Sequence, residues 1–146
     1  MKILLVDAAF AAEPIYDALV RLGHEVWVIG NRSSDILAAK AGDRWIKQDY
    51  SDVNAVRGHL LRLNIGRVVP GCTDVSLETC VKLGSPWYCG DAPEVNAAIS
   101  DKAAFRKLCV ELDLPAPRAV DVSSFPRQGR FICKPVDAFS GRGISV

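Results

Sequence analysis

The chain has 146 residues, of which 49% are hydrophobic and 24% are charged, and its formal net charge is +1. This composition supports a buried core and argues against disorder. The near-neutral charge provides no broad basic field for a nucleic acid and no acidic field for a cationic partner. The length suits one compact domain, or one domain joined to part of a second.

The first thirty residues predict a βαβ unit. Residues 2–7 are a short apolar run, which is typical of a strand covered on both faces in a parallel sheet. Residues 25–30 form a second such run, and Gly23 before it can take the left-handed conformation that ends a helix. Between the two runs, apolar residues recur at helical spacing: Ile15, Ala18, Leu19 and Leu22.

The alternation of helix and strand continues to about residue 90. We expect a short helix over 34–41, a short strand over 44–47 and a strand over 67–70. The helix before this last strand is capped by Ser51 or Asp52, ends at Asn64, and buries Val53, Val56, Leu60 and Leu63. The helix after it buries Leu77, Cys80 and Val81 before a turn at Gly84, and a short fifth strand covers 87–89. The predicted fold is an α/β doubly wound parallel sheet, Rossmann-like, over residues 1–92.

A different pattern begins after residue 92. Residues 93–117 read as a helical linker, whose second helix places Phe105, Leu108, Cys109 and Leu112 on one face. Residues 118–146 read as a β-hairpin with a glycine-bearing loop and the start of another strand. Because a hairpin alone is marginally stable, we expect a longer parent protein or a partner chain to complete it, and its open edge makes a homodimer plausible.

Five cysteines are present, an odd number without the spacing of a metal site: Cys72, Cys80, Cys89, Cys109 and Cys133. We interpret them as small buried hydrophobic residues of a reducing compartment. The N-terminal apolar run is too short for a signal sequence or a membrane span. The sequence therefore predicts a cytoplasmic protein that does not bind membranes.

The ends of the first and fourth strands are the places where a doubly wound sheet binds ligands. The first turn, residues 7–13, contains no glycine, so its backbone cannot approach a pyrophosphate and an NAD-dependent oxidoreductase is disfavoured. Asp7 is interpreted as a capping or turn carboxylate. At the fourth strand, Gly71, Thr73 and Asp74 could receive a substrate carboxylate or phosphate, or Thr73 or Asp74 could simply cap the next helix.

A candidate phosphate site lies in the last third of the chain. Residues 100–146 carry 8 Lys and Arg against 5 Asp and Glu, whereas residues 1–99 carry 10 against 12. Lys134 ends an apolar strand, and six residues later a small-residue loop begins: Ser140, Gly141, Arg142 and Gly143. A point cation beside free backbone N–H groups suits a triphosphate, although such a loop by itself could be an ordinary hairpin turn.

The order of these elements resembles the ATP-grasp superfamily. The likeness rests on 96–102, Phe105 with Arg106, the break at 114–117, the strand end 132–135 and the loop 140–144. It is closest to the branch of carbamoyl-phosphate synthase large chains and biotin carboxylases. It implies that residues 1–92 are a pre-ATP-grasp domain and that 118–146 begin an ATP-grasp domain.

The resemblance also implies a cofactor and roles for particular residues. Lys102 matches a cation that reaches the phosphates of ATP, and Lys134 matches the strand lysine at the α-phosphate. The loop that folds over the β- and γ-phosphates would be Ser140, Gly141, Arg142 and Gly143. In the family, the adenine hinge and the acidic ligands of Mg²⁺ lie far beyond position 146, so this chain is expected to contain no catalytic metal ligands.

We therefore interpret the chain as the N-terminal part of an ATP-dependent carboxylate–amine ligase that acts through an acyl phosphate and is inactive alone. Its small-molecule partner is a carboxylate. The alternative is a stand-alone nucleotide-binding or assembly module without catalysis. These two hypotheses differ in how Mg-ATP binding responds to changes at Lys134.

Overall fold

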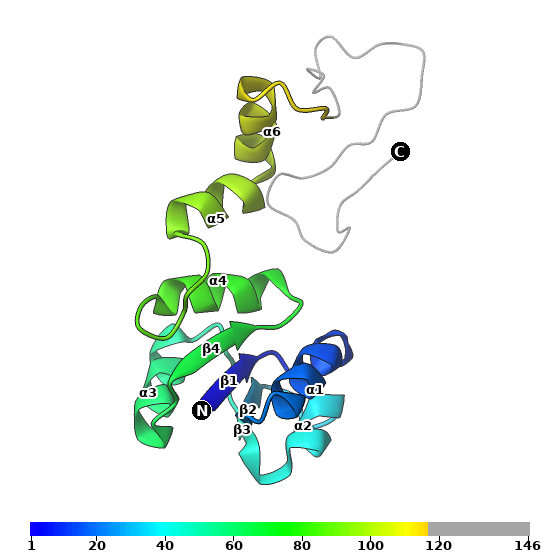
Figure 1. Cartoon of the computed structure of the whole chain (residues 1–146), viewed down its shortest axis with the longest axis vertical. Coiled ribbons are helices and arrows are strands. Elements are labelled where there is room, and N and C mark those ends of the chain that lie inside the picture. The colour runs from blue at the N-terminus through cyan, green and yellow to red at the C-terminus, as the bar shows by residue number, and fades with distance from the viewer. Residues whose placement is uncertain (117–146) are drawn as a thin grey trace. The chain divides into compact units, whose positions relative to one another are not determined.

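The computed structural model describes residues 1–116 and divides the chain into two compact units, Met1–Pro93 and Glu94–Val146. The first unit contains a four-stranded sheet in the order β3-β2-β1-β4 (Figure 1). All pairs of neighbouring strands are parallel. Its strands are β1 Lys2–Val6, β2 Glu25–Gly30, β3 Trp45–Lys47 and β4 Arg67–Pro70.

Helices cover both faces of this sheet (Figure 1). Side chains of β1 alternate between the faces, as the two-residue period of a strand requires: Leu4 and Val6 pack against α3 and α4, while Leu5 packs against α1 and α2. The predicted doubly wound parallel α/β sheet is confirmed. The helical elements of this unit are η1 Phe10–Ala12, α1 Glu13–Arg21, α2 Ile36–Ala41, η2 Gly42–Arg44, α3 Val53–Leu63 and α4 Asp74–Leu83.

Three predicted helix-terminal positions are confirmed, and of Ser51 and Asp52 it is Asp52 that caps α3. Asp52 caps α3 by accepting the backbone N–H of Ala55, and Asn64 ends the helix with a φ of 52°. Gly23, with a φ of 79°, follows α1. All three positions depend on local chemistry, which explains why they could be predicted from the sequence.

Other expectations were wrong. Leu22 is 71% exposed, because α1 ends at Arg21; the face of α1 that packs on the sheet contains the buried Tyr16 and the partly buried Ile15 and Leu19. Leu77 is only half-buried, since α4 turns Ser76 and Thr79 toward the core. Residues 87–89 form no strand: this segment makes a turn and one ladder-like bond, from the N–H of Val68 to the carbonyl of Trp87.

The expectation that the cysteines are buried holds for only two of the four described. Cys80 and Cys109 are buried, whereas Cys72 and Cys89 are exposed. Cys80 lies on the core-facing side of α4, whereas Cys72 and Cys89 lie in the connections before and after this helix. The difference therefore follows from the position of each residue in the fold rather than from its apolar neighbours in sequence. Cys133 lies outside the described residues.

The described part of the second unit consists of two helices, of which α5 begins at the boundary. These are α5 Pro93–Ser100 and α6 Lys102–Glu111. The carboxylate of Asp101 caps α6 by accepting the backbone N–H groups of Ala103 and Ala104 at 2.9 and 2.7 Å. The predicted apolar face of α6 is only partly buried: Cys109 is buried, while Phe105 and Leu112 are 44% and 58% exposed. Within residues 1–116, no helix has the length and apolar character needed to cross a membrane.

Candidate functional site

The carboxyl ends of β1 and β4 lie side by side, because the two strands pair in parallel. β1 pairs with β2 on its other edge, so the order of the strands changes direction at β1. Val6 is in register with Pro70, and the N–H of Gly71 extends the ladder by donating to the carbonyl of Val6 at 3.0 Å. Such a switch point is where doubly wound sheets bind ligands. We call the five residues gathered there the carboxyl-edge cluster: Asp7, Tyr50, Gly71, Cys72 and Thr73.

Asp7 joins the two turns of this cluster. Its side chain is almost fully buried, and its two carboxylate oxygens accept separate backbone N–H groups. Oδ1 accepts from Ala9 at 2.9 Å, in the turn after β1, and Oδ2 accepts from Cys72 at 3.2 Å, in the turn after β4. The interpretation of Asp7 as a turn carboxylate is confirmed, and its reach to the second turn is an additional finding.

Gly71 provides the room for this carboxylate. A Cβ at position 71 would lie 2.2 Å from the Cβ of Asp7 and 2.7 Å from its Oδ2. The space left by the missing side chain is thus filled from within the protein. Whether Gly71 also contacts a substrate stays a prediction.

Thr73 links the second turn to the segment after β3 as well as to α4. It is the N-cap of α4, and its Oγ1 accepts the N–H of Ser76 at 3.2 Å. The same Oγ1 lies 3.2 Å from the hydroxyl of Tyr50, and the carbonyl of Tyr50 accepts from Thr79 Oγ1 at 3.0 Å. The capping role considered for Thr73 is confirmed, and its hydroxyl is already engaged on two sides.

The surroundings of Tyr50 favour its neutral phenol. Burial raises its pKa above the usual value, and the negative charges of Asp7 and Asp49 act in the same direction. The hydrogen bond to Thr73 and the charge of Arg32 oppose this shift. Tyr50 was not recognised in the sequence, because it follows the shortest strand and no motif marks it.

The remaining predicted site residues lie elsewhere. Asp74 is the exposed first residue of α4. Lys102 is the half-buried first residue of α6 in the second unit. The phosphate-site residues predicted from the last third of the chain lie outside the described residues: Lys134, Ser140, Gly141, Arg142 and Gly143. Among residues 1–116, no group of three or more metal-ligating side chains is placed to hold a metal ion.

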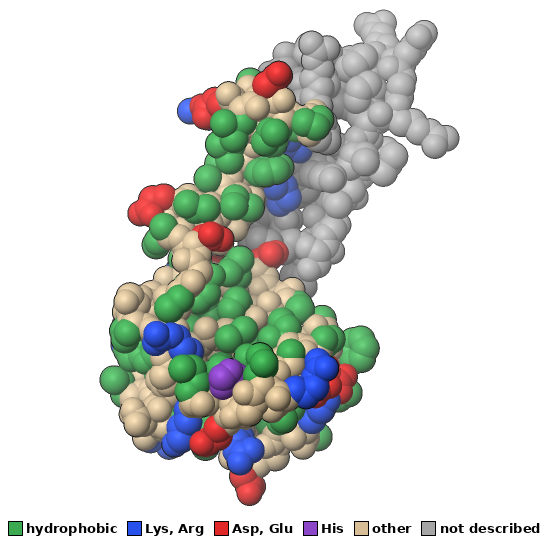
Figure 2. All heavy atoms as spheres, in the orientation of Figure 1, with side chains coloured by type: hydrophobic (Ala, Val, Ile, Leu, Met, Phe, Trp, Pro, Cys, Tyr) green, Lys and Arg blue, Asp and Glu red, His purple; other side chains and the backbone are tan. Residues whose placement is uncertain are grey.

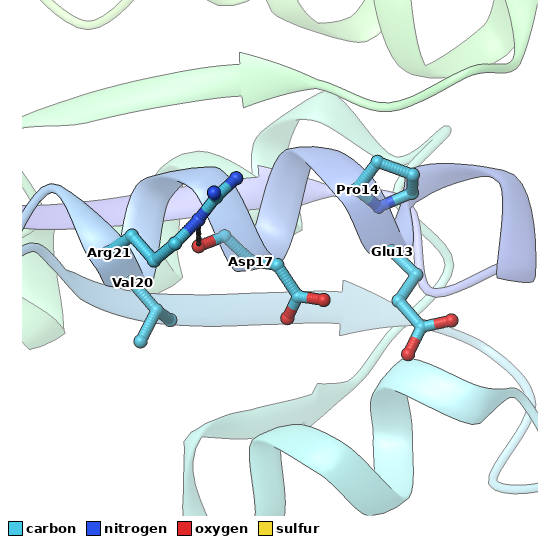
Figure 3. Close-up of a pocket in the computed structure, with 5 residues that line it drawn as sticks. All are labelled: Glu13, Pro14, Asp17, Val20 and Arg21. Atoms are coloured by element: carbon cyan, nitrogen blue, oxygen red, sulfur yellow. Dashed lines mark hydrogen bonds between the residues drawn. The ribbon is translucent and has the colours of Figure 1, made fainter.

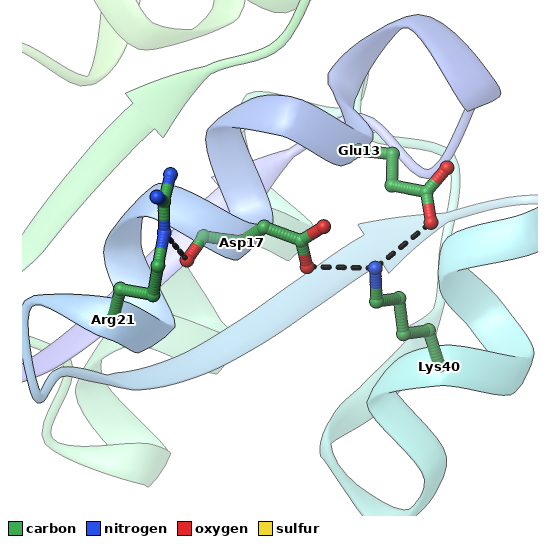
Figure 4. A network of polar contacts seen from close by, with 4 residues as sticks. All are labelled: Glu13, Asp17, Arg21 and Lys40. Atoms are coloured by element: carbon green, nitrogen blue, oxygen red, sulfur yellow. Dashed lines mark hydrogen bonds and ion pairs between the residues drawn. The ribbon is translucent and has the colours of Figure 1, made fainter.

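A shallow pocket along α1 is separate from the carboxyl-edge cluster (Figure 3). Its lining comes entirely from this helix: Glu13, Pro14, Asp17, Val20 and Arg21. Lys40 of α2 lies 2.8 Å from Glu13 Oε1 and 2.6 Å from Asp17 Oδ1 (Figure 4). These two carboxylates raise the pKa of Lys40 through hydrogen bonds, Asp17 more than Glu13. The two carboxylates of the pocket therefore tie α1 to α2 through Lys40.

Two of the solved structures that resemble this chain are synthetases. One is phosphoribosylglycinamide synthetase from Anaerococcus prevotii, with a TM-score of 0.64 and 16% identity over 77% of this chain and 29% of that one. The other is N5-carboxyaminoimidazole ribonucleotide synthetase from Thermotoga maritima, with a TM-score of 0.65 and 16% identity over 84% of this chain and 34% of that one. Both share its fold.

The extent of these matches carries further information. The first unit ends at Pro93 of a 146-residue chain, so alignments over 77% and 84% of the chain extend into the second unit. The chain spans about a third of the length of either synthetase. No protein-family model matches the sequence, and no curated protein matches it.

Proposed function

We propose that this chain forms the first part of an ATP-dependent ligase of the ATP-grasp superfamily. The observation that carries the proposal is the shared fold: both synthetases match the doubly wound unit and part of the second unit. The order of sequence elements from residue 96 onward is a second support for the proposal. It is independent of the first, because it concerns the identities of residues and not the fold. The resemblance to one branch of the superfamily, that of carbamoyl-phosphate synthases and biotin carboxylases, receives no support from the two matches and stays a prediction.

The proposed reaction has two steps. A carboxylate oxygen of the substrate attacks the γ-phosphorus of ATP, ADP leaves, and an acyl phosphate forms. An amine nitrogen then attacks the acyl carbon, phosphate leaves, and the nitrogen loses a proton to give the amide. Exclusion of water protects the acyl phosphate between these steps, which is the role proposed for the loop over the phosphates: Ser140, Gly141, Arg142 and Gly143.

In this proposal the cations that contact ATP are Lys102 and Lys134, and Mg²⁺ adds charge neutralisation when it is bound. Lys102 begins α6, whose N-cap is already filled by the carboxylate of Asp101. The described residues contain no cluster suited to Mg²⁺, so we derive no step through it. The metal ligands and the adenine hinge belong to the remaining part of the ligase, whether on the same chain or on a partner.

The first unit is proposed to receive the carboxylate substrate at its carboxyl edge, near Gly71, Thr73 and Asp74. The names of the two synthetases contain a phosphoribosyl compound and a ribonucleotide, and these substrates belong to those proteins. A nucleic acid is not an expected partner. On the face shown in Figure 2, basic and acidic side chains are interspersed over the first unit rather than gathered by sign.

The test is Mg-ATP binding by the complete ligase of which this chain is proposed to be the first part. Lys134→Ala should weaken binding at least tenfold, where each tenfold corresponds to about 1.4 kcal/mol. Lys107→Ala is the matched control, because Lys107 is an exposed lysine of α6 whose nearest carboxylate is Glu111 at 3.8 Å. Equal ATP affinity in the parent and in Lys134→Ala would contradict the site and favour an assembly module without catalysis.

A further inference from the structure

The turn after β1 is where a doubly wound sheet ordinarily receives the phosphate of a nucleotide ligand. In this chain that turn already contains an anion. The carboxylate of Asp7 is 3% exposed and accepts the N–H groups of Ala9 and Cys72 at 2.9 and 3.2 Å. Backbone N–H groups of this kind are the donors that a phosphate oxygen would need.

Both turns are shaped around this carboxylate. Asp7 has a φ of 151°, a conformation that residues other than glycine rarely adopt. Gly71 on the opposite turn leaves the space that the carboxylate fills, since a Cβ there would be 2.7 Å from Oδ2. An unusual backbone conformation at Asp7 and a position that has no room for a Cβ at Gly71 thus meet at one carboxylate, which points to a specific role for its placement.

The start of the following helix is equally unsuited to a phosphate. A 3₁₀ turn separates β1 from α1, and α1 has no side-chain cap. Its first residue, Glu13, is acidic, and its second, Pro14, has no N–H to donate. The carboxylate of Glu13 pairs with Lys40 at 2.8 Å, so even the nearby cation is engaged. The N-terminus of a helix ordinarily attracts an anion. At α1 this end carries a negative charge and has one N–H donor fewer, so it does not favour a phosphate.

We propose that Asp7 is a specificity-determining residue whose carboxylate takes the place of a ligand phosphate. The first unit then accepts a substrate that carries no phosphate on the end that lies at the turn after β1. A phosphorylated end would meet a buried like charge and would find its N–H donors already used. This inference rests on the proposed ligase function, because it narrows the class of the substrate, and it sets the substrate apart from phosphoribosyl compounds.

The experiment is a titration of the 146-residue chain with inorganic phosphate and, separately, with ribose 5-phosphate, followed by the backbone amide signals of Ala9 and Cys72 in NMR spectra. In the parent, these two signals should show no saturable shift with either probe. Asp7→Gly removes the charge, frees both N–H groups and suits the φ of 151°. This variant should bind at least one probe at the two amides, tenfold or more tightly than the parent.

Asp43→Asn is the control, because it removes one negative charge at an exposed residue of η2 and leaves Asp7 in place. It should behave like the parent. A folded Asp7→Gly protein that binds no better than the parent would overturn the proposal. If Asp7→Gly does not fold, the parent titration decides: saturable shifts at Ala9 and Cys72 overturn the proposal, and their absence upholds it. Neither result depends on ATP binding. This test can therefore fail while the ligase proposal stands, and the ligase proposal can fail while this inference about Asp7 stands.

Discussion

The backbone of Gly71 lies against the side chain of Asp7 so closely that a Cβ on residue 71 would be 2.2 Å from the Cβ of Asp7. A Cβ essentially never lies so close to an atom to which it is not bonded, so Gly71→Ala must displace one of the two turns. We expect a loss of about 1–3 kcal/mol in the free energy of unfolding, measured by urea denaturation. In an Asp7→Gly background the same change should cost much less, because the clashing side chain is gone.

Gly58 provides the matched control for that pair. It lies inside α3, and a Cβ there would meet nothing within 4 Å. Gly58→Ala should therefore stabilise the chain, by about 0.5–1 kcal/mol, through the better helix propensity of alanine. If Gly71→Ala were as harmless as Gly58→Ala, the close approach of residues 7 and 71 would not exist in solution.

Thr73 should be sensitive to the loss of its hydroxyl rather than to its size. Thr73→Val removes the cap of α4 and the partner of the Tyr50 hydroxyl, at a cost of about 1–2 kcal/mol in unfolding free energy. Thr73→Ser keeps both contacts and should cost much less. Because the hydroxyls of Thr73 and Tyr50 share one hydrogen bond, the effects of Thr73→Val and Tyr50→Phe should not add. Full additivity would mean that this bond contributes nothing.

Cys80 should make stability fall at high pH. Burial raises the pKa of its thiol to about 12, from 9.0 in the unfolded chain. The folded state therefore holds the proton more tightly, and the stabilisation is fully present below pH 9.0 and is lost as pH rises toward about 12. The loss of unfolding free energy across this range should be smaller in Cys80→Ala, and an unchanged pH profile would argue against the assignment.

Thiol labelling should separate the cysteines by their position in the fold. In the native protein, a thiol reagent should modify the exposed Cys72 and Cys89 quickly and the buried Cys80 and Cys109 slowly. Peptide mapping by mass spectrometry identifies the labelled residues, and denaturant should make all four reactive. Fast labelling of Cys80 without denaturant would contradict the packing of α4 against the sheet.

Asp101 should control the first turn of α6, where Lys102 lies. Asp101→Ala removes the acceptor for the N–H groups of Ala103 and Ala104 and should cost about 0.5–2 kcal/mol of local stability. The measurement is amide hydrogen exchange at Ala103 and Ala104, which should speed up. Asp101→Ser retains a capping oxygen and should exchange nearly as slowly as the parent.

The sequence by itself determined the features that depend on local chemistry. The apolar run of β2, a cap at Ser51 or Asp52, and the ends of helices at Gly23 and Asn64 were all predicted, because period, capping oxygens and left-handed residues act over a few positions. The doubly wound fold followed from their order. The exposure of side chains was predicted less well. Leu22 continues the apolar pattern of α1 in sequence, but it is exposed because the helix ends one residue before it.

Only the tertiary structure decided which polar groups meet. Thr79 is buried, and its hydroxyl donates to the carbonyl of Tyr50, which lies in the segment after β3. Asp7 and Gly71 are likewise adjacent only because β1 and β4 pair in parallel. Such contacts cannot be predicted from the neighbours of a residue in sequence, because the order and register of the strands create them. The carboxylate that fills the first turn was visible in the sequence, but the position it occupies was not.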